Sequence, residues 1–513
     1  MKKTLCIMLV FILFMSGCKK TAAPPAETTS PTGEFTLAMH KPESLDPLSA
    51  TRKSSVLIFD LVYDSLVYVD REMRPVPYLA ESCTVSEDGM TISFTLQNGI
   101  LWHDGAAFTA TDVDHTISRI RSMGEDCIYY DRIRYIDAVV VQDMLHFDIR
   151  LTRPHITVLN LLDFPIVPSH RSDLDTTMVG TGQYRLDAYT PQKSMTLKKN
   201  ENWTLSDLPA METIHVKMLE KTAEVANMVK IGEVTAIATT MDSVGGLGIG
   251  DTMKITHYPT LEYVFAGFNL ESPPLRTRQM RQGISAAINR EKIIDDVFLG
   301  YGNAATVPVP PTSYMYVGAE TDKPARDVNG ALSLFYEAGY NLVDGKLQRE
   351  TEEGEMRAVN ISLLVNEENE RRGKLAEKIR EALGEVGIAV TVEAVPFSEY
   401  QRRLGEGEFD MYVGGCTFSA DLTYNFLLGE NPVVQNGYDS PEMLLALQTL
   451  DPQKTDDTIR AAYVRFQEIF LRDMPLCGIA FLEGALVHTA ALKGIENLAA
   501  SKIYRNIGKW YLQ

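Results

Sequence analysis

Residues 91–113 read TISFTLQNGILWHDGAAFTATDV and carry the clearest local pattern in the chain. Ile92, Phe94 and Leu96 alternate with polar residues and are followed by the pair Asn98-Gly99. Alternation of this kind predicts a half-buried strand, and an Asn-Gly pair is typical of a tight turn.

A helix is predicted to begin at the end of the same stretch. Thr109 and Asp112 have the spacing of a capping box, and Val113, Ile117 and Ile120 then recur at helical intervals.

Strands and helices alternate outward from this region. Residues 181–200 are predicted as strands, 279–289 and 371–383 as helices, and 387–392 as a strand. This order predicts an α/β fold with partly parallel sheets. No repeat with a period of about 20 to 50 residues is present, which disfavours solenoids and propellers.

The N-terminus has the pattern of a secretion signal. Two lysines precede an apolar run, Leu5 to Met15, which is too short to span a bilayer and ends at Ser16-Gly17-Cys18. That ending resembles the bacterial lipobox, so we expect residues 1–17 to be removed and Cys18 to carry the lipid. The alternative is an ordinary signal in which Cys18 is incidental. Residues 18–33 are rich in Pro, Thr and Ala and are predicted to be a disordered tether.

Composition and motifs disfavour several function classes. A formal net charge of -19 argues against nucleic acid as a partner. The sequence contains no nucleophile elbow, no H-E-x-x-H and no phosphate-binding loop motif, so neither an enzyme nor a cofactor is predicted. The glycine run 245–250 is not followed by a helical pattern and is predicted to be a flexible loop.

The cysteines and histidines indicate no metal site. Cys83, Cys127, Cys416 and Cys477 remain after Cys6 leaves with the leader, and an even number permits disulfides whose pairing stays open. No C-x-x-C spacing and no i,i+4 histidine pair is present.

Several motifs together resemble the extracellular solute-binding proteins of family 5, the peptide, dipeptide and nickel class of ABC-importer receptors. The early motifs are Ser44–Pro47 (SLDP), Ile58–Tyr68 (IFDLVYDSLVY), Pro77–Glu81 (PYLAE), Ser86–Gly89 (SEDG), Leu101–Gly105 (LWHDG) and Phe108–Val113 (FTATDV). The later ones are Gly180–Tyr184 (GTGQY), Lys199–Trp203 (KNENW), Met280–Arg290 (MRQGISAAINR) and Phe409–Met411 (FDM).

This resemblance implies a bilobal, type II periplasmic-binding-protein clamp with mixed sheets, helices and an insertion subdomain. Lobe I is expected to comprise residues 34–58, 177–263 and 479–513, with the insertion at 59–176, and lobe II residues 264–478. Crossing strands would act as a hinge, and closure on a ligand would be a population shift.

The resemblance also implies where a ligand would sit. In peptide receptors of this family an aspartate after the "yDl" strand pairs with the ligand's ammonium, and Asp421 is the only acidic candidate in the corresponding loop. Asp421 could instead cap the segment 422–428. Cys416, Thr417 and Phe418 from the same loop, and Met39 and His40 at the end of the first strand, are further candidates. Met39 could equally be a core residue and His40 a solvated one.

The predicted function is capture of a peptide-like solute and its delivery to an ABC permease and ATPase complex. The protein is expected to be a monomeric lipoprotein outside the cytoplasm, held on a membrane through its N-terminal lipid. Binding of an oligosaccharide or a nickel chelate, and a surface signalling receptor or adhesin on the same clamp, are the alternatives.

Overall fold

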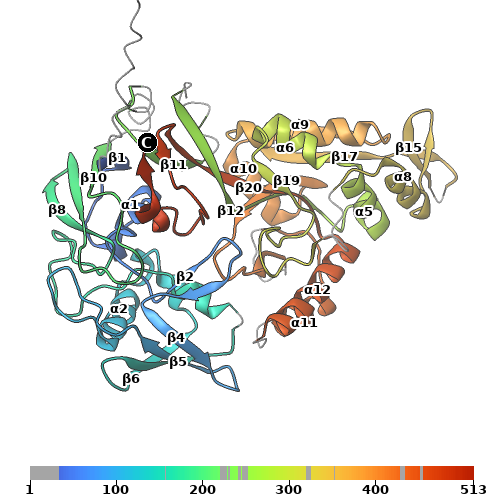
Figure 1. Cartoon of the computed structure of the whole chain (residues 1–513). Helices are drawn as coiled ribbons and strands as arrows, with labels where there is room; N and C mark the ends of the chain where they lie inside the picture. Colours follow the sequence, from blue (N-terminus) through green and yellow to red (C-terminus); the bar gives the residue numbers. More distant parts are fainter. Residues whose placement is uncertain are drawn as a thin grey trace, which may run out of the picture.

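The structure is a computed structural model, drawn in Figure 1. It describes residues 34–155, 157–219, 228, 231–240, 244, 252–318, 325–351, 353–427, 434–450 and 455–513. The predicted leader and tether and the glycine run 245–250 lie outside these ranges. No helix within them is long and apolar enough to cross a membrane.

One mixed sheet runs through the whole molecule. The parallel pairs β1–β10, β1–β11, β17–β18 and β17–β19 are joined to antiparallel ones, which confirms the predicted mixed α/β fold. In spatial order its strands are β18 (Ala389–Val395), β17 (Asn360–Asn366), β19 (Met411–Thr417), β12 (Met253–Phe268), β20 (Leu476–Thr489), β11 (Ala236–Thr240), β1 (Glu34–His40), β10 (Thr213–Leu219), β9 (Ser194–Lys199) and β8 (Tyr184–Thr190), with β13 (Gly302–Ala304) paired to β20.

Two long antiparallel strands connect the halves of this sheet. The start of β12 pairs with the end of β20 beside β11, whereas the end of β12 lies between β20 and β19. Figure 1 shows β12 and β20 between a left half, which we call lobe I (β1, β8–β11), and a right half, lobe II (β17–β19 with their helices). The chain passes from one half to the other through these two strands.

The segment between β1 and β8 forms a small sheet packed on lobe I. Its strands, in spatial order, are β4 (Ala80–Val85), β5 (Thr91–Leu96), β7 (His146–Leu151) and β6 (Ile136–Val141). Strand β5 and helix α2 (Ala110–Met123) confirm the strand and helix predicted at residues 91–113, and the capping box of Thr109 and Asp112 is present. Ile92 and Phe94 belong to the same hydrophobic core as Leu37 and Val216, so this subdomain and lobe I share one core.

Helices cover both faces of the sheet in lobe II. One face carries α5 (Arg278–Ala287), α6 (Arg290–Phe298), α8 (Val328–Glu337) and α9 (Glu370–Gly384), and the other α10 (Phe397–Glu406), α11 (Pro441–Leu450) and α12 (Asp456–Asp473). Helices α5 and α9 confirm the two predicted at residues 279–289 and 371–383, and their apolar residues Met280, Ile284, Leu375 and Ile379 are fully buried. Helix α5 ends two residues earlier than predicted, because Ile288 has an extended backbone.

The remaining elements are short. They are α1 (Lys53–Phe59), the pairs β2 (Val67–Val69) with β3 (Pro75–Pro77) and β21 (Leu492–Lys493) with β22 (Tyr511–Leu512), the sheet of β14 (Asn341–Val343), β15 (Lys346–Glu350) and β16 (Met356–Ala358), and single turns of 3-10 helix at Pro47–Ser49, Gly124–Asp126, Tyr130–Ile133, Val158–Leu162, Pro273–Leu275, Asn425–Leu427 and Arg505–Lys509.

The β2–β3 hairpin reaches from the lobe I side into lobe II. Val69 and Met73 are buried in the core cluster of α10–α12. Arg74 lies beside them with its guanidinium 4.2 Å from the Tyr314 ring centre and 2.7 Å from a carboxylate oxygen of Asp456. The lobes are therefore in contact at the hairpin as well as through the long strands.

All four cysteines in the described residues are free thiols. Cys127 and Cys477 are buried, and Cys83 and Cys416 are partly buried. No disulfide among these four therefore stabilises the fold in this structure.

Candidate functional site

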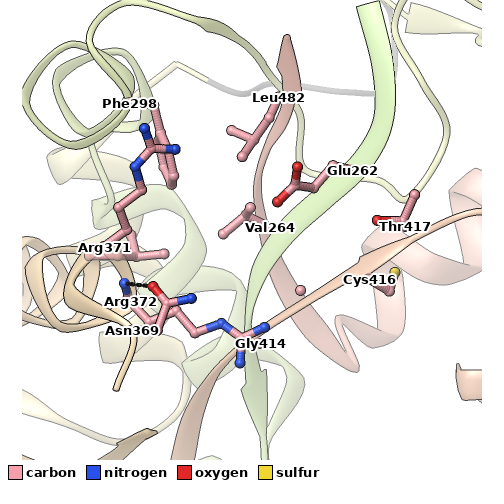
Figure 2. Close-up of a pocket in the computed structure, with 12 residues that line it drawn as sticks. Glu262, Val264, Phe298, Asn369, Arg371, Arg372, Gly414, Cys416, Thr417 and Leu482 are labelled. Atoms are coloured by element: carbon pink, nitrogen blue, oxygen red, sulfur yellow. Dashed lines mark hydrogen bonds between the residues drawn. The ribbon is translucent and has the colours of Figure 1, made fainter. Parts of the chain in front are cut away.

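A pocket of about 190 Å³ lies on the lobe II side of the long strands. It is formed by the bend of β12, the end of β19, the first turn of α9 and the end of α6. Figure 2 shows the guanidinium of Arg371 beside Phe298, that of Arg372 extending toward Gly414, and the carboxylate of Glu262 on a further side of the pocket. Polar and charged groups from three separate segments therefore converge on one small volume.

Glu262 owes its position to a break in the pairing of β12. The register with β20 is regular up to Pro259 and resumes at Tyr263, so residues 260–262 form a bulge. Bulges re-aim side chains and bend strands. Glu262 instead pairs with Thr417 of β19, which brings both residues to the pocket at the point where β12 passes from lobe I to lobe II.

The two arginines occupy the first turn of α9. The side chain of Asn369 caps this helix by accepting a hydrogen bond from the backbone N of Arg372 at 3.0 Å. Arg372 Nη1 donates to Asn366 Oδ1 at 3.2 Å, and the Arg371 guanidinium lies 5.8 Å from the Phe298 ring centre. The positive end of the helix dipole adds to these two charges, so this wall of the pocket favours an anion.

A glycine leaves room for one of these guanidiniums. A Cβ atom at Gly415 would stand 3.7 Å from Arg372 Nη2 and 3.2 Å from the Tyr263 carbonyl oxygen. A Cβ atom there would make an ordinary van der Waals contact with Arg372, and its tighter contact would be with the Tyr263 carbonyl oxygen.

Partial desolvation shifts the pKa of three charged groups in or near the pocket. Partial desolvation raises the pKa of Glu262 even though its side chain remains exposed, and Lys53 and Arg372 act to lower it. Desolvation lowers the pKa of Lys53, an exposed residue of α1 in lobe I, and Glu262 opposes that change. Desolvation also lowers the pKa of Arg371. Glu262 and the two arginines thus present opposite charges to one pocket, so the pocket suits a ligand with both signs of charge.

Two of the six predicted ligand-binding residues line this pocket. Cys416 and Thr417 contribute to its wall. Burial raises the pKa of the Cys416 thiol to about 12, so the thiol stays protonated at neutral pH. Phe418 instead packs in the lobe II core, with its ring centre 6.2 Å from Tyr263 and 6.1 Å from Phe481.

The predicted residues of β1 lie on the lobe I side. Met39 is 2% exposed and belongs to the lobe I core. His40 is partly buried, and its Nδ1 lies 3.3 Å from the hydroxyl of Ser54 in α1. Neither residue lines the pocket of Arg371 and Arg372.

Asp421 is buried and already has protein partners. Its side chain forms an ion pair with Arg134 and accepts a hydrogen bond from Thr423 Oγ1 at 2.9 Å. Its backbone oxygen accepts from Thr157 Oγ1 at 3.0 Å. Within the described part of residues 422–428 there is only the short turn Asn425–Leu427, so Asp421 does not cap an α-helix there.

The sequence interpretation missed Glu262, Arg371 and Arg372. Both arginines lie within the helix predicted at residues 371–383, and the sequence pattern assigns them no role. One feature of the sequence could have indicated the arginines. Two adjacent arginines in the first turn of a helix are unfavourable against the helix dipole, so their presence there suggests that they bind an anion. No comparable signal exists for Glu262, since its position depends on the bulge.

Comparisons with known proteins place the chain in a family. Residues 74–430 match the model of bacterial extracellular solute-binding proteins, family 5. The chain belongs to this family. It is therefore a non-catalytic solute-binding protein of the class that serves ABC transporters outside the cytoplasm.

Individual relatives match this chain over most of their own length. The chain is 24% identical over 477 residues to the glutathione-binding protein GsiB of Salmonella paratyphi A, covering 88% of this chain and 89% of that one. It is 21% identical over 547 residues to the oligopeptide-binding protein AppA of Bacillus subtilis, covering 99% and 98%. The crystal structure of the ABC transporter substrate binding protein CtaP of Listeria monocytogenes matches with a TM-score of 0.75 and 18% identity, covering 94% of this chain and 99% of that one.

No metal cluster was found in the described residues. No group of three or more His, Cys, Asp or Glu side chains there is arranged to hold a metal ion.

Proposed function

We propose that this family member binds short peptides with free carboxylates in the pocket of Arg371, Arg372 and Glu262, and delivers them to an ABC permease and ATPase in the membrane. The supporting observation is the convergence of two guanidiniums and one carboxylate on a single pocket where the chain passes between the lobes.

The pocket offers a partner for each charged group of a peptide. A carboxylate can accept paired hydrogen bonds from a guanidinium, which is the strongest common mode of carboxylate recognition. The ligand's ammonium would face Glu262. Phe298, Val264 and Leu482 supply an apolar wall for the intervening chain.

The balance of charges favours a peptide with more carboxylates than ammonium groups. Glutathione has two carboxylates and one ammonium, which corresponds to the two arginines and one glutamate of the pocket. The relatives named for glutathione and for oligopeptides fit this proposal.

Closure would couple binding to delivery. Lys53 lies on lobe I and interacts electrostatically with Glu262 near lobe II, so a ligand at Glu262 would change a contact between the lobes. A ligand shifts the population toward the closed form only through contacts that the open form lacks.

Arg372→Met is expected to weaken binding of glutathione and trialanine by tenfold or more, because it removes a partly desolvated partner of the carboxylate. Isothermal titration measures the change. Arg380→Met on the outer side of the same helix is the matched control, since Arg380 forms an exposed pair with Glu377. Peptides with an amidated C-terminus should bind more weakly to the unmodified protein.

The proposal would be contradicted if neither peptide bound, or if amidation and Arg372→Met had no effect. Native mass spectrometry of the gently purified protein provides an independent outcome. Co-purifying peptides would support the proposal, whereas a sugar or a metal chelate would replace it.

The lipid anchor at Cys18 is part of the same proposal. Cys18→Ala is expected to move the protein from the membrane fraction to the soluble fraction or the medium, because several acyl chains are what hold a lipoprotein firmly. Cys6→Ala is the control, since Cys6 lies in the expected leader. Retention of the Cys18→Ala protein on the membrane would show that Cys18 is not the anchor.

A further inference from the structure

A second cavity lies apart from the proposed peptide pocket. It measures about 680 Å³ and is formed by the β2–β3 hairpin, the segment 203–206 and the C-terminal segment 497–509. It shares no lining residue with the pocket of Arg371 and Arg372. Its volume is within the range of about 300–1,000 Å³ that small-molecule sites occupy.

The innermost cation of this cavity is held in a fixed position. The Arg505 guanidinium lies in the corner formed by the rings of Tyr68 and Tyr78, with its central carbon 3.0 Å and 4.3 Å from their centres. Cation–π contacts of this kind orient the guanidinium without using its hydrogen-bond donors.

Two buried donors lining this cavity have no acceptor. Nη1 of Arg505 and Nε1 of Trp203 are buried without a hydrogen-bond partner, and Trp203 is only 7% exposed. The carboxylate of Asp64 lies near the indole but outside hydrogen-bond geometry and accepts from Thr181 Oγ1 at 3.0 Å. An unsatisfied buried donor costs about 1–3 kcal/mol, so an acceptor that reaches these two atoms through a small shift of the cavity wall would be favoured, although it would have to outweigh the nearby negative charge of Asp64.

The remaining charges of the cavity wall are mostly positive. Arg71 and Lys509 are exposed at its rim. The carboxylate of Asp70 forms hydrogen bonds within its own turn: Oδ1 accepts from the backbone N of Glu72 at 2.9 Å and from that of Arg74 at 2.8 Å. Lys502 is paired with the buried Asp60, which lines a smaller neighbouring cavity. With Lys502 paired to Asp60, the wall presents the three cations Arg71, Arg505 and Lys509 against the two carboxylates Asp70 and Glu72.

From this arrangement we propose a second binding site, which takes a small organic oxyanion, a carboxylate or a phosphate, on a flat body. The oxyanion accepts from Arg505 Nη1 and Trp203 Nε1, and the flat body lies against the aromatic residues of the wall. Lys509 and Arg71 attract the anion at the entrance, against the acidic charge of the chain as a whole.

Binding of benzoate and phenyl phosphate, with benzyl alcohol as the uncharged probe, tests this site. Isothermal titration uses the Arg372→Met protein as well as the unmodified one, so that binding in the peptide pocket is recognised. At least one of the two anions is expected to bind both proteins with a Kd below about 1 mM, and benzyl alcohol is not. The two anions distinguish a carboxylate site from a phosphate site.

Three variants locate the binding. Trp203→Phe keeps the aromatic body and removes the donor, and Lys509→Ala changes an exposed rim residue, so both variants are expected to fold. Each should weaken binding of the anion by about threefold or more. Arg505→Gln should weaken it by tenfold or more. Lys346→Ala, an exposed lysine of β15, is the control. The proposal fails if neither anion binds at about 10 mM, if Arg372→Met abolishes binding, or if Trp203→Phe and Lys509→Ala bind like the control.

Discussion

Gly180→Ala is expected to lower the free energy of unfolding by about 3 kcal/mol or more. A Cβ atom at this position would stand 1.8 Å from the carbonyl oxygen of Val62 and 2.6 Å from its carbonyl carbon. Both neighbours are backbone atoms, so a rotamer change cannot relieve the clash.

The loop around Gly180 has no room to shift. The backbone N of Gly182 donates to the Val62 oxygen at 2.8 Å, and the Gly180 oxygen accepts from the backbone N of His103 at 2.8 Å. Moving the loop would therefore break contacts with two separate segments of the lobe I core. This explains physically why the GTGQY motif contains glycine at this position.

Urea unfolding followed by circular dichroism measures the effect. Gly373→Ala in α9 is the matched control, because no atom lies within 4 Å of the added Cβ, and replacing a helix glycine should stabilise the protein by up to about 1 kcal/mol. If Gly180→Ala shifted the transition no more than the control does, the loop would not be seated on Val62 as described.

Local patterns were predictable because the interactions that create them are local. The start of α2 depends on Thr109 and Asp112, three residues apart, and on apolar residues within the next three turns. Strand β5 is likewise recognisable from Ile92, Phe94 and Leu96, all of which are buried.

The arrangement of the large sheet was not predictable from such patterns. Strand β1 pairs in parallel with β10, nearly two hundred residues later, and β12 pairs with β20 across a similar separation. The general clamp came from the family resemblance. The strand order depends on long-range pairing that hydrophobic periodicity alone does not encode.

The candidate site illustrates the same limit. Cys416 and Thr417 are the last two residues of β19 and do not lie in the loop where they were predicted, but their proximity to the pocket could be inferred from the motif that begins this strand. Glu262, Arg371 and Arg372 come from two segments more than one hundred residues apart, and only the fold brings them to one pocket. Electrostatic convergence of this kind is a property of the three-dimensional structure.

Arg134→Met is expected to destabilise the protein by about 3 kcal/mol, because it leaves the buried carboxylate of Asp421 without its cation. The side chain of Asp421 is 0% exposed and that of Arg134 31% exposed, so the lower end of the range for buried pairs applies. Thr423 still donates to the carboxylate, which limits the loss.

The control is again Arg380→Met, which breaks an exposed pair and should cost at most about 1 kcal/mol. Asp421→Asn should cost less than Arg134→Met, because it leaves behind a partly exposed guanidinium rather than a buried carboxylate. The reverse order of stabilities would contradict this account of the pair.

The same two variants decide whether Asp421 contacts the ligand. Arg134 comes from the lobe I side and Asp421 from lobe II, so their ion pair joins the lobes, and its loss would change affinity through the open–closed equilibrium. If Asp421 acts only through Arg134, the double variant should bind peptides with the same affinity as either single variant. The affinity for N-acetylated peptides should then fall as much as the affinity for free peptides. If Asp421 instead pairs with the ligand's ammonium, Asp421→Asn should weaken the binding of free peptides tenfold or more. The binding of N-acetylated peptides should stay nearly unchanged. Because Arg134 already occupies this carboxylate, a ligand ammonium would have to displace it, and the acetylation test separates these two uses of one buried charge.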